Sequence, residues 1–258
     1  MSDIKLVLTD FDGTVAQMGK HIVSDAVRDA VTACENQNVR MVPVTGRYYE
    51  MARPVLEILG FEDLGIFDNG ATIQNCITGE IIWKQWIDPE TAKQVARICV
   101  PGAYDVDYTD EHIQHAPADN EMEVIDDINH SVPHVYALVE RSKVEAISKK
   151  LDQIKGITYY TASGANDKWP DAVGIQVNHD QADKFHGVNA LRDILGIPIE
   201  ETLAIGDGDN DVALFKNANI KIAMGNATDA LKFQADHIVA SVDQDGFVEA
   251  MNMYVLNK

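Results

Sequence analysis

Short apolar segments alternate with helical patterns at both ends of this chain, and this alternation limits the fold more than any other feature. Apolar runs typical of buried strands occur at residues 4–10, 39–45, 64–70, 202–207 and 220–225. Amphipathic helical stretches lie near residues 24–38, 48–59, 186–195, 210–216 and 245–255. Ser24 stands where it can cap the first of these helices. Strands that alternate with helices of this length form a parallel sheet covered on both faces. We therefore predict an α/β fold with a doubly wound parallel sheet.

The middle of the chain has a different pattern. Short strand-like or hairpin-like runs predominate there, with two helical stretches near residues 89–99 and 142–153. This pattern predicts an α+β domain inserted into the α/β domain. The predicted α/β domain comprises residues 1–83 and 181–258, and the predicted insert comprises residues 84–180.

Composition and charge exclude several kinds of partner. The 258 residues include 21 basic and 41 acidic side chains, which gives a formal charge of −20. Nucleic acids and anionic membranes need basic patches, so we expect neither as a partner. Without a long apolar run or a basic, apolar leader, the chain is expected to be cytoplasmic, as a monomer or a homodimer. Cys34, Cys76 and Cys99 form no CxxC pair and are expected to be buried free thiols.

Acidic and polar clusters end three of the predicted strands. They are TDFDGT at residues 9–14, VTGR at 44–47 and GDGDND at 206–211. Parallel strands bring their carboxyl ends to one edge of the sheet, so the three clusters should converge there. Several ionised carboxylates at one place need a cation, and oxygen ligands favour Mg²⁺. The sequence therefore predicts a Mg²⁺ site at this edge.

A calcium-binding loop is the first alternative, because D-x-D-G and D-x-D-x-D resemble parts of an EF-hand. That loop requires Gly at its sixth position and Glu at its twelfth. Neither a loop that starts at Asp10 nor one that starts at Asp207 has these residues. The EF-hand interpretation is therefore rejected.

Phosphoryl transfer is a reaction that such a set of residues could catalyse. Asp10 could attack phosphorus and form an aspartyl-phosphate, and Asp12 could protonate the leaving oxygen and then take a proton from water. Thr45 and the amides after it could hold one phosphoryl oxygen, and a lysine could hold another. Mg²⁺ would offset the repulsion between the carboxylate and the phosphate. Such local positive charge is needed because the net charge repels an anionic substrate.

At this point the chain resembles the haloacid dehalogenase (HAD) superfamily of phosphatases. DFDGT, VTGR, a lysine ahead of a helix and GDGDND occur in this order, with the insert between the second and third motifs. This order resembles the Cof-like branch with a C2-type cap, as do the stretches FDNGATI, IAMGNATDALKFQAD and DQDGFVEAM. The resemblance implies a HAD-like, Rossmann-type core and an α+β cap domain that sets substrate specificity.

The resemblance also implies a role for individual residues. Asp10 is the implied nucleophile, and Asp12 is the implied general acid and base. The implied Mg²⁺ ligands are Asp10, the backbone carbonyl of Asp12, Asp207 and Asp211, the last either directly or through water. The implied phosphate-binding residues are Thr45, Gly46, Asn210 and a lysine.

Two lysines are candidates for the third motif. Lys184 precedes a helix, as the resemblance requires, and we prefer it to Lys168. In the usual pattern glycine follows the lysine at once, whereas here Phe185 and His186 intervene.

Two alternative roles are considered for each of three further residues near the motifs. Arg47 is predicted either to contact the substrate or the cap or to form a surface or inter-domain ion pair. Asn69 is predicted either to line the site or to belong to a hairpin turn, since DNGA suits such a turn. Asp209 is interpreted as a solvated loop acid rather than a catalytic one.

The sequence as a whole predicts a Mg²⁺-dependent phosphatase that acts on a small phosphorylated metabolite, with a sugar phosphate favoured. A phosphomutase with the same nucleophile is the nearest alternative. A phosphoaspartyl switch or binding module is another, although a switch should not carry its own hydrolytic acid and base, as Asp12 would be.

Overall fold

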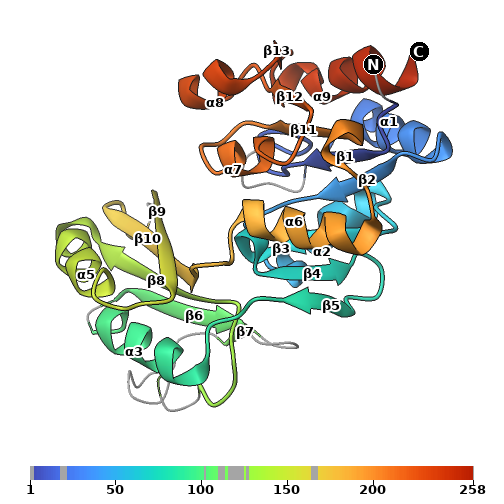
Figure 1. The fold of residues 1–258 in the computed structure, drawn as a ribbon. Coiled ribbons are helices and arrows are strands. Elements are labelled where there is room, and N and C mark those ends of the chain that lie inside the picture. The colour runs from blue at the N-terminus through green and yellow to red at the C-terminus, as the bar shows by residue number, and fades with distance from the viewer. Residues whose placement is uncertain are drawn as a thin grey trace. The chain divides into compact units, whose positions relative to one another are not determined.

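The chain folds into two units, each with its own hydrophobic core. The computed structural model describes residues 3–17, 22–101, 103–109, 114–115, 125, 128–163 and 168–257. One unit comprises Met1–Trp83 and Asp183–Lys258, and the other comprises Lys84–Ala182. Each unit is described by itself below (Figure 1).

A five-stranded parallel sheet forms the centre of the first unit. Its strands, in spatial order, are β13 (His237–Ile238), β12 (Ile220–Ala223), β11 (Thr202–Gly206), β1 (Leu6–Thr9) and β2 (Arg40–Pro43). Every residue of β1 and β11 is buried. Apart from Thr9 and Thr202 these strands are apolar, as expected where helices cover both faces of a sheet.

A three-stranded sheet continues from the edge of the parallel sheet. It consists of β3 (Leu64–Phe67), β4 (Thr72–Asn75) and β5 (Ile81–Lys84), and β3 and β4 pair antiparallel. A parallel bridge between Val44 and Ile66 joins β3 to the segment after β2. The loop after β2 therefore lies beside the loop after β3.

Two sets of helices cover the parallel sheet. Helix α1 (Asp25–Asn36) packs against α2 (Tyr49–Leu59) and α9 (Gly246–Met251), which continues into a turn at Asn252–Leu256. Helix α7 (Asp211–Phe215) packs against α6 (Lys184–Leu195) and α8 (Asp229–Gln234). The chain moves from β1 to β2 in one direction across the sheet and from β11 to β12 in the other. Right-handed crossovers therefore place the two sets on opposite faces.

Local sequence signals explain where several helices begin and end. Ser24 caps α1, as predicted, because its hydroxyl accepts a hydrogen bond from the backbone amide of Val27. Asp183 caps α6 by accepting from the backbone amide of His186 at 2.8 Å. Helix α2 ends at Gly60, whose φ of 76° lies in the left-handed region that glycine adopts readily. No helix in the described part of the chain is long and apolar enough to span a membrane.

The second unit is an antiparallel sheet with helices packed on it. Its strands, in spatial order, are β7 (Gln114–His115), β6 (Asp105–Thr109), β8 (His134–Glu140), β10 (Ala172–His179) and β9 (Ile157–Ser163). Helices α3 (Pro89–Cys99) and α5 (Val144–Leu151) pack together, and their apolar side chains share a core with β8 and β10.

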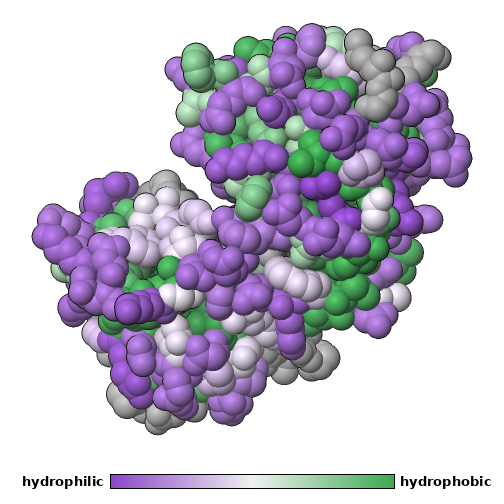
Figure 2. Space-filling view, in the orientation of Figure 1, coloured by the Kyte–Doolittle hydropathy of each residue, from purple (hydrophilic) through white to green (hydrophobic). Residues whose placement is uncertain are grey.

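The predicted fold class is confirmed. The parallel sheet with helices on both faces is the doubly wound core, and the antiparallel unit is the α+β insert. All three cysteines are buried free thiols, also as predicted. The face of the molecule in Figure 2 is mainly hydrophilic, in keeping with a composition that is 24% charged.

Candidate active site

The loop after β1 carries the first two acids. Asp10 follows the last strand residue directly, and its backbone amide donates to the carbonyl of Ile205 on β11. Its side chain is buried. Gly13 turns the chain away from the strand with a φ of 82°, a conformation that is unfavourable for other residues. Asp12 is therefore left partly exposed at the carboxyl end of β1.

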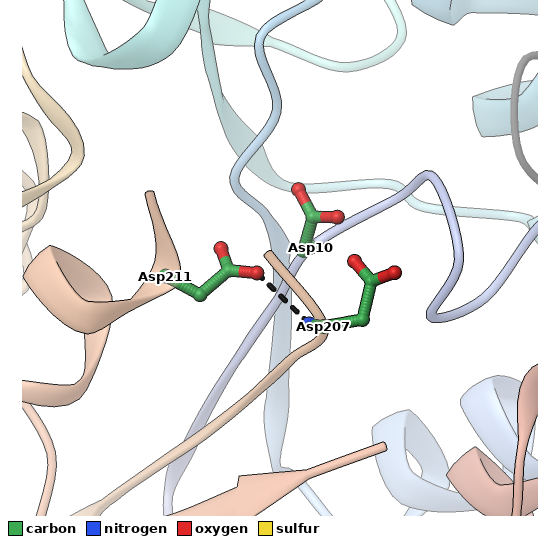
Figure 3. A group of neighbouring side chains, drawn as sticks. All are labelled: Asp10, Asp207 and Asp211. Atoms are coloured by element: carbon green, nitrogen blue, oxygen red, sulfur yellow. Dashed lines mark hydrogen bonds between the residues drawn. The ribbon is translucent and has the colours of Figure 1, made fainter. Parts of the chain in front are cut away.

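The loop after β11 carries the next two acids. Asp207 follows the strand, and Asp211 begins α7. One oxygen of Asp211, Oδ2, accepts hydrogen bonds of 2.9 Å from the backbone amides of Asp207 and Gly208. This contact closes the loop, and Figure 3 shows the bond to Asp207 as a dashed line.

Three buried carboxylates from these two loops meet in one place (Figure 3). Asp10, Asp207 and Asp211 each contribute an oxygen, and these oxygens all lie within 4.8 Å of one another. Burial, together with the charge of Asp211, raises the pKa of Asp10 to about 7, although Lys184 opposes this rise. Burial and Asp211 likewise raise the pKa of Asp207 to about 6. Asp10 and Asp207 therefore bind a proton more readily than an exposed aspartate does.

Lys184, the first residue of α6, supplies a positive charge within this cluster. Its Nζ donates to Asp10 Oδ1 at 2.6 Å and to Asp211 Oδ1 at 2.7 Å, and 1% of the side chain is exposed. Burial favours the neutral amine, but Asp10 and Asp211 outweigh this effect and raise the pKa of Lys184. Of the two candidate lysines, the structure therefore brings Lys184 to the acids. Lys168 belongs to the second unit, where its Nζ lies 4.1 Å from the centre of the Trp169 ring.

The loop after β2 brings Thr45, Gly46 and Arg47 to the same edge of the sheet. Arg47 is buried and forms a two-point ion pair with Asp12, with its Nε 2.8 Å from Oδ2 and its Nη2 2.6 Å from Oδ1. Its backbone amide donates to the hydroxyl of Thr45. Arg47 thus forms an ion pair, but its side chain is buried and the pair lies within the first unit, so it is neither the surface pair nor the inter-domain pair that was predicted.

A turn between β3 and β4, whose residues have positive φ values, forms hydrogen bonds with the Thr45–Arg47 loop. Asp68, Asn69 and Gly70 have successive φ values of 54°, 58° and 110°. The backbone amide of Asn69 donates to the carbonyl of Thr45, and that of Asp68 donates to the carbonyl of Arg47. A Cβ atom on Gly46 would lie 2.9 Å from Asn69 Oδ1. Asn69 thus belongs to a turn of an antiparallel pair and also contacts the predicted phosphate-binding loop.

Two predicted loop residues lie at the outer side of the cluster. Asn210 precedes α7 and is exposed, and its Oδ1 would lie 2.6 Å from a Cβ atom on Gly208. Asp209 is exposed as well, and it accepts a hydrogen bond of 2.6 Å from Thr228. The position of Asp209 agrees with its interpretation as a solvated loop acid.

One residue of the site was not singled out from the sequence. Asn226, in the loop after β12, donates to Asp207 Oδ2 at 3.0 Å and to the carbonyl of Gly13 at 2.8 Å. The available signal was its place just after the predicted strand at 220–225, whose carboxyl end lies at the same edge as those of β1 and β11.

A doubly wound sheet with carboxylates at the ends of two adjacent strands defines the protein as an α/β protein with an acidic site at one edge of its sheet. The family model of haloacid dehalogenase-like hydrolases matches residues 7–251. The chain therefore belongs to the haloacid dehalogenase-like hydrolases.

Curated relatives and solved structures agree with this assignment. A phosphoglycolate phosphatase of Methanobrevibacter smithii is 27% identical over 98% of this chain and 100% of its own length. The 5-amino-6-(5-phospho-D-ribitylamino)uracil phosphatase YcsE of Bacillus subtilis is 27% identical over 98% of this chain and 97% of its own length. A haloacid dehalogenase-like hydrolase from Bacteroides thetaiotaomicron has the same fold, with a TM-score of 0.81, 23% identity and coverage of 97% and 99% of the two chains. Together with the family, the named activities of these relatives identify the chain as an enzyme of the phosphatase type.

Proposed function

We propose that this protein is a Mg²⁺-dependent phosphatase that hydrolyses a small-molecule phosphate monoester through an aspartyl-phosphate on Asp10. The observation that supports this most directly is the contact of Asp10 with Lys184 inside a cluster of three buried carboxylates. A buried carboxylate next to a fixed cation is suited to attack an anionic phosphate, because its negative charge is compensated locally.

The donor atoms of the cluster fit Mg²⁺, which takes oxygen ligands. Asp10 uses Oδ1 in its ion pair with Lys184, and Asp207 uses Oδ2 to accept a hydrogen bond from Asn226. Each carboxylate can therefore offer its other oxygen to the metal ion, Oδ2 of Asp10 and Oδ1 of Asp207. Both oxygens of Asp211 already accept hydrogen bonds. We therefore assign Asp10 and Asp207 as direct ligands and Asp211 as a ligand through water. The family resemblance adds the backbone carbonyl of Asp12 as a direct ligand. Bound Mg²⁺ would supply charge that neutralises the phosphate and the carboxylates.

The chain's own side chains carry the two chemical steps. Asp10 attacks phosphorus, so a bond forms from its carboxylate oxygen to phosphorus while the bond to the leaving alcohol oxygen breaks. Asp12 protonates that oxygen. Asp12 then takes a proton from water, whose oxygen attacks phosphorus and releases Asp10. Lys184, Thr45, Gly46 and Asn210 hold phosphoryl oxygens in this proposal.

Arg47 contacts Asp12, the residue that takes a proton from water in the second, hydrolytic step. Its Nε and Nη2 each donate a hydrogen bond to one carboxyl oxygen of Asp12, at 2.8 Å and 2.6 Å. The ion pair also fixes the orientation of Asp12. Arg47 therefore orients the general base in this proposal, a role distinct from contact with the substrate.

The substrate is proposed to be a small phosphorylated metabolite, with a sugar phosphate favoured. The names of the two relatives support this, since each describes the phosphatase of a small phosphate monoester, and one of these carries a phosphorylated ribityl group. The second unit is proposed to act as the cap that contacts the leaving group and excludes water. A cytoplasmic location is part of the proposal, because the buried thiols suit a reducing compartment.

Replacement of the nucleophile gives the sharpest test. Asp10→Asn is expected to abolish release of phosphate from p-nitrophenyl phosphate while the protein stays folded, because the amide preserves the shape of the carboxyl group but is not a nucleophile. Asp209→Asn removes an exposed acid of the same edge and is the control, with activity close to that of the wild type. Circular dichroism checks that the Asp10→Asn variant is folded. Substantial phosphate release by the folded variant would contradict the mechanism.

A panel of phosphorylated metabolites, assayed with Mg²⁺ and with chelator, would identify the substrate class. Release of inorganic phosphate that depends on Mg²⁺ is the expected result. An isomerised sugar phosphate without free phosphate would indicate a phosphomutase instead. A long-lived phosphoprotein without turnover would indicate a phosphoaspartyl switch.

A further inference from the structure

The side-chain amide of Asn226 makes three hydrogen bonds, all within the first unit. Its Nδ2 donates to the backbone carbonyl of Gly13 at 2.8 Å and to Asp207 Oδ2 at 3.0 Å. Its Oδ1 accepts from the backbone amide of Val242 at 2.9 Å. These partners define the orientation of the amide, since a flipped group would direct oxygen at two oxygens and nitrogen at an N–H.

This amide joins three loops that are far apart in the sequence. The loop after β1 contributes Gly13, the loop after β11 contributes Asp207, and the turn before α9 contributes Val242. The contact between the first two loops is tight, because a Cβ atom on Gly13 would lie 2.1 Å from Asp207 Oδ2. Oδ2 of Asp207 therefore accepts a hydrogen bond from the Asn226 amide and also packs closely against Gly13.

We propose that Asn226 is a positioning residue for the metal site. By holding Oδ2 of Asp207, it presents Oδ1 to the cation. By holding the carbonyl of Gly13, it fixes the turn that follows Asp12, whose own carbonyl is an assigned ligand. Residues that hydrogen-bond to metal ligands typically contribute about 10–100-fold to metal affinity or activity. This inference rests on the Mg²⁺ site of the proposed function.

The test is a calorimetric titration of the full-length protein with Mg²⁺ in the absence of substrate. Asn226→Ala removes both donors and is expected to raise the dissociation constant for Mg²⁺ by about 10-fold or more. Asn219→Ala is the matched control. The backbone amide of Asn219 donates to Thr202 at the start of β11, so this residue lies at the opposite, amino end of the sheet. Its side chain donates to the carbonyl of Glu200 at 3.4 Å, in an exposed position. An unchanged Mg²⁺ affinity is expected for Asn219→Ala.

A second variant acts on the orientation of Asn226 without changing that residue. Val242→Pro removes the N–H that Asn226 Oδ1 accepts. Proline suits this position, the first residue of a helical turn, and the preceding Ser241 has the extended conformation that proline requires. Val242→Pro is expected to weaken Mg²⁺ binding less than Asn226→Ala, and it decides the question if Asn226→Ala does not fold.

The outcomes separate this inference from the proposed function. Weaker Mg²⁺ binding by Asn226→Ala, or by Val242→Pro if the former is unfolded, supports the positioning role. Wild-type affinity in the folded variant contradicts that role and leaves the proposed function intact. An absence of Mg²⁺ binding by the wild-type protein contradicts both.

Discussion

At the scale of single residues, the state of Lys184 follows from the two carboxylates beside it. A buried ammonium ion without partners would lose its proton, because burial disfavours the charged form. Asp10 and Asp211 reverse this effect and keep the pKa of Lys184 above its usual value. The same ion pair lowers the pKa of Asp10, against the larger effect of burial. Each charge is therefore maintained by the others, so the loss of one should disturb the whole cluster.

Replacement of Lys184 tests this interdependence. Lys184→Ala is expected to lower activity by about 100-fold or more, the usual effect of removing one donor that stabilises charge in a transition state. Lys168→Ala should leave activity near the wild-type value. Phosphate release by both variants, measured at saturating Mg²⁺, makes the comparison. A larger loss in Lys168→Ala would assign the third motif to that residue.

At the scale of elements, the ends of strands and the start of one helix position the site. The turn at residues 68–70 packs against the start of α6, where Lys184 lies. A Cβ atom on Gly70 would lie 2.0 Å from the carbonyl oxygen of Asp183. Only glycine allows this close approach at a φ of 110°. The turn therefore contacts both the Thr45–Arg47 loop and the start of the helix that carries Lys184.

A pair of glycine substitutions separates this close packing from backbone strain. Gly60 has a φ of 76°, but no atom lies within 4 Å of the Cβ it lacks. Gly60→Ala is expected to lower the free energy of unfolding by about 1 kcal/mol, from the left-handed conformation alone. Gly70→Ala should cost about 2 kcal/mol more, because the added atom must also displace backbone. Urea unfolding measures both, and equal effects would contradict the packing argument.

At the scale of the whole molecule, the charge of −20 and the acidic cluster link stability to pH and to the metal. The pKa values of Asp10 and Asp207, about 7 and about 6, exceed the ordinary value of 3.8 that applies in the unfolded chain. Between about pH 4 and pH 7 the folded state therefore binds more protons at these groups than the unfolded state. Their contribution to the stability of the metal-free protein falls as pH rises through this window.

Mg²⁺ should reverse that loss, because it binds the ionised carboxylates. At a concentration 100-fold above its dissociation constant, a ligand stabilises by about 2.7 kcal/mol, which corresponds to about 5–10 °C in melting temperature for a chain of this size. We expect a rise of this order at pH 8 and a much smaller one at pH 5. Thermal unfolding with Mg²⁺ and with chelator at both pH values provides the measurement. Equal effects at the two pH values would show that the acidic cluster is not the binding site.

The sequence was sufficient to predict the fold class and the family because both depend on local patterns. Apolar runs that alternate with amphipathic helices indicate a parallel sheet, and the carboxyl ends of its strands must share one edge. The convergence of Asp10, Asp207 and Asp211 follows from this rule, and the capping of α1 by Ser24 follows from the local preference for serine at the start of a helix. The catalytic and ligand roles of these acids remain predictions, which the variants above test.

Side-chain partners were decided only by the tertiary structure. The ion pair of Arg47 with Asp12 joins positions 35 residues apart, and the bond from Asn226 to Gly13 joins positions 213 apart. Neither pairing leaves a local pattern, because each depends on how loops from separate strands pack at one edge. The sequence by itself thus determined which residues reach that edge, and the packing of the loops decided which donor faces which acceptor.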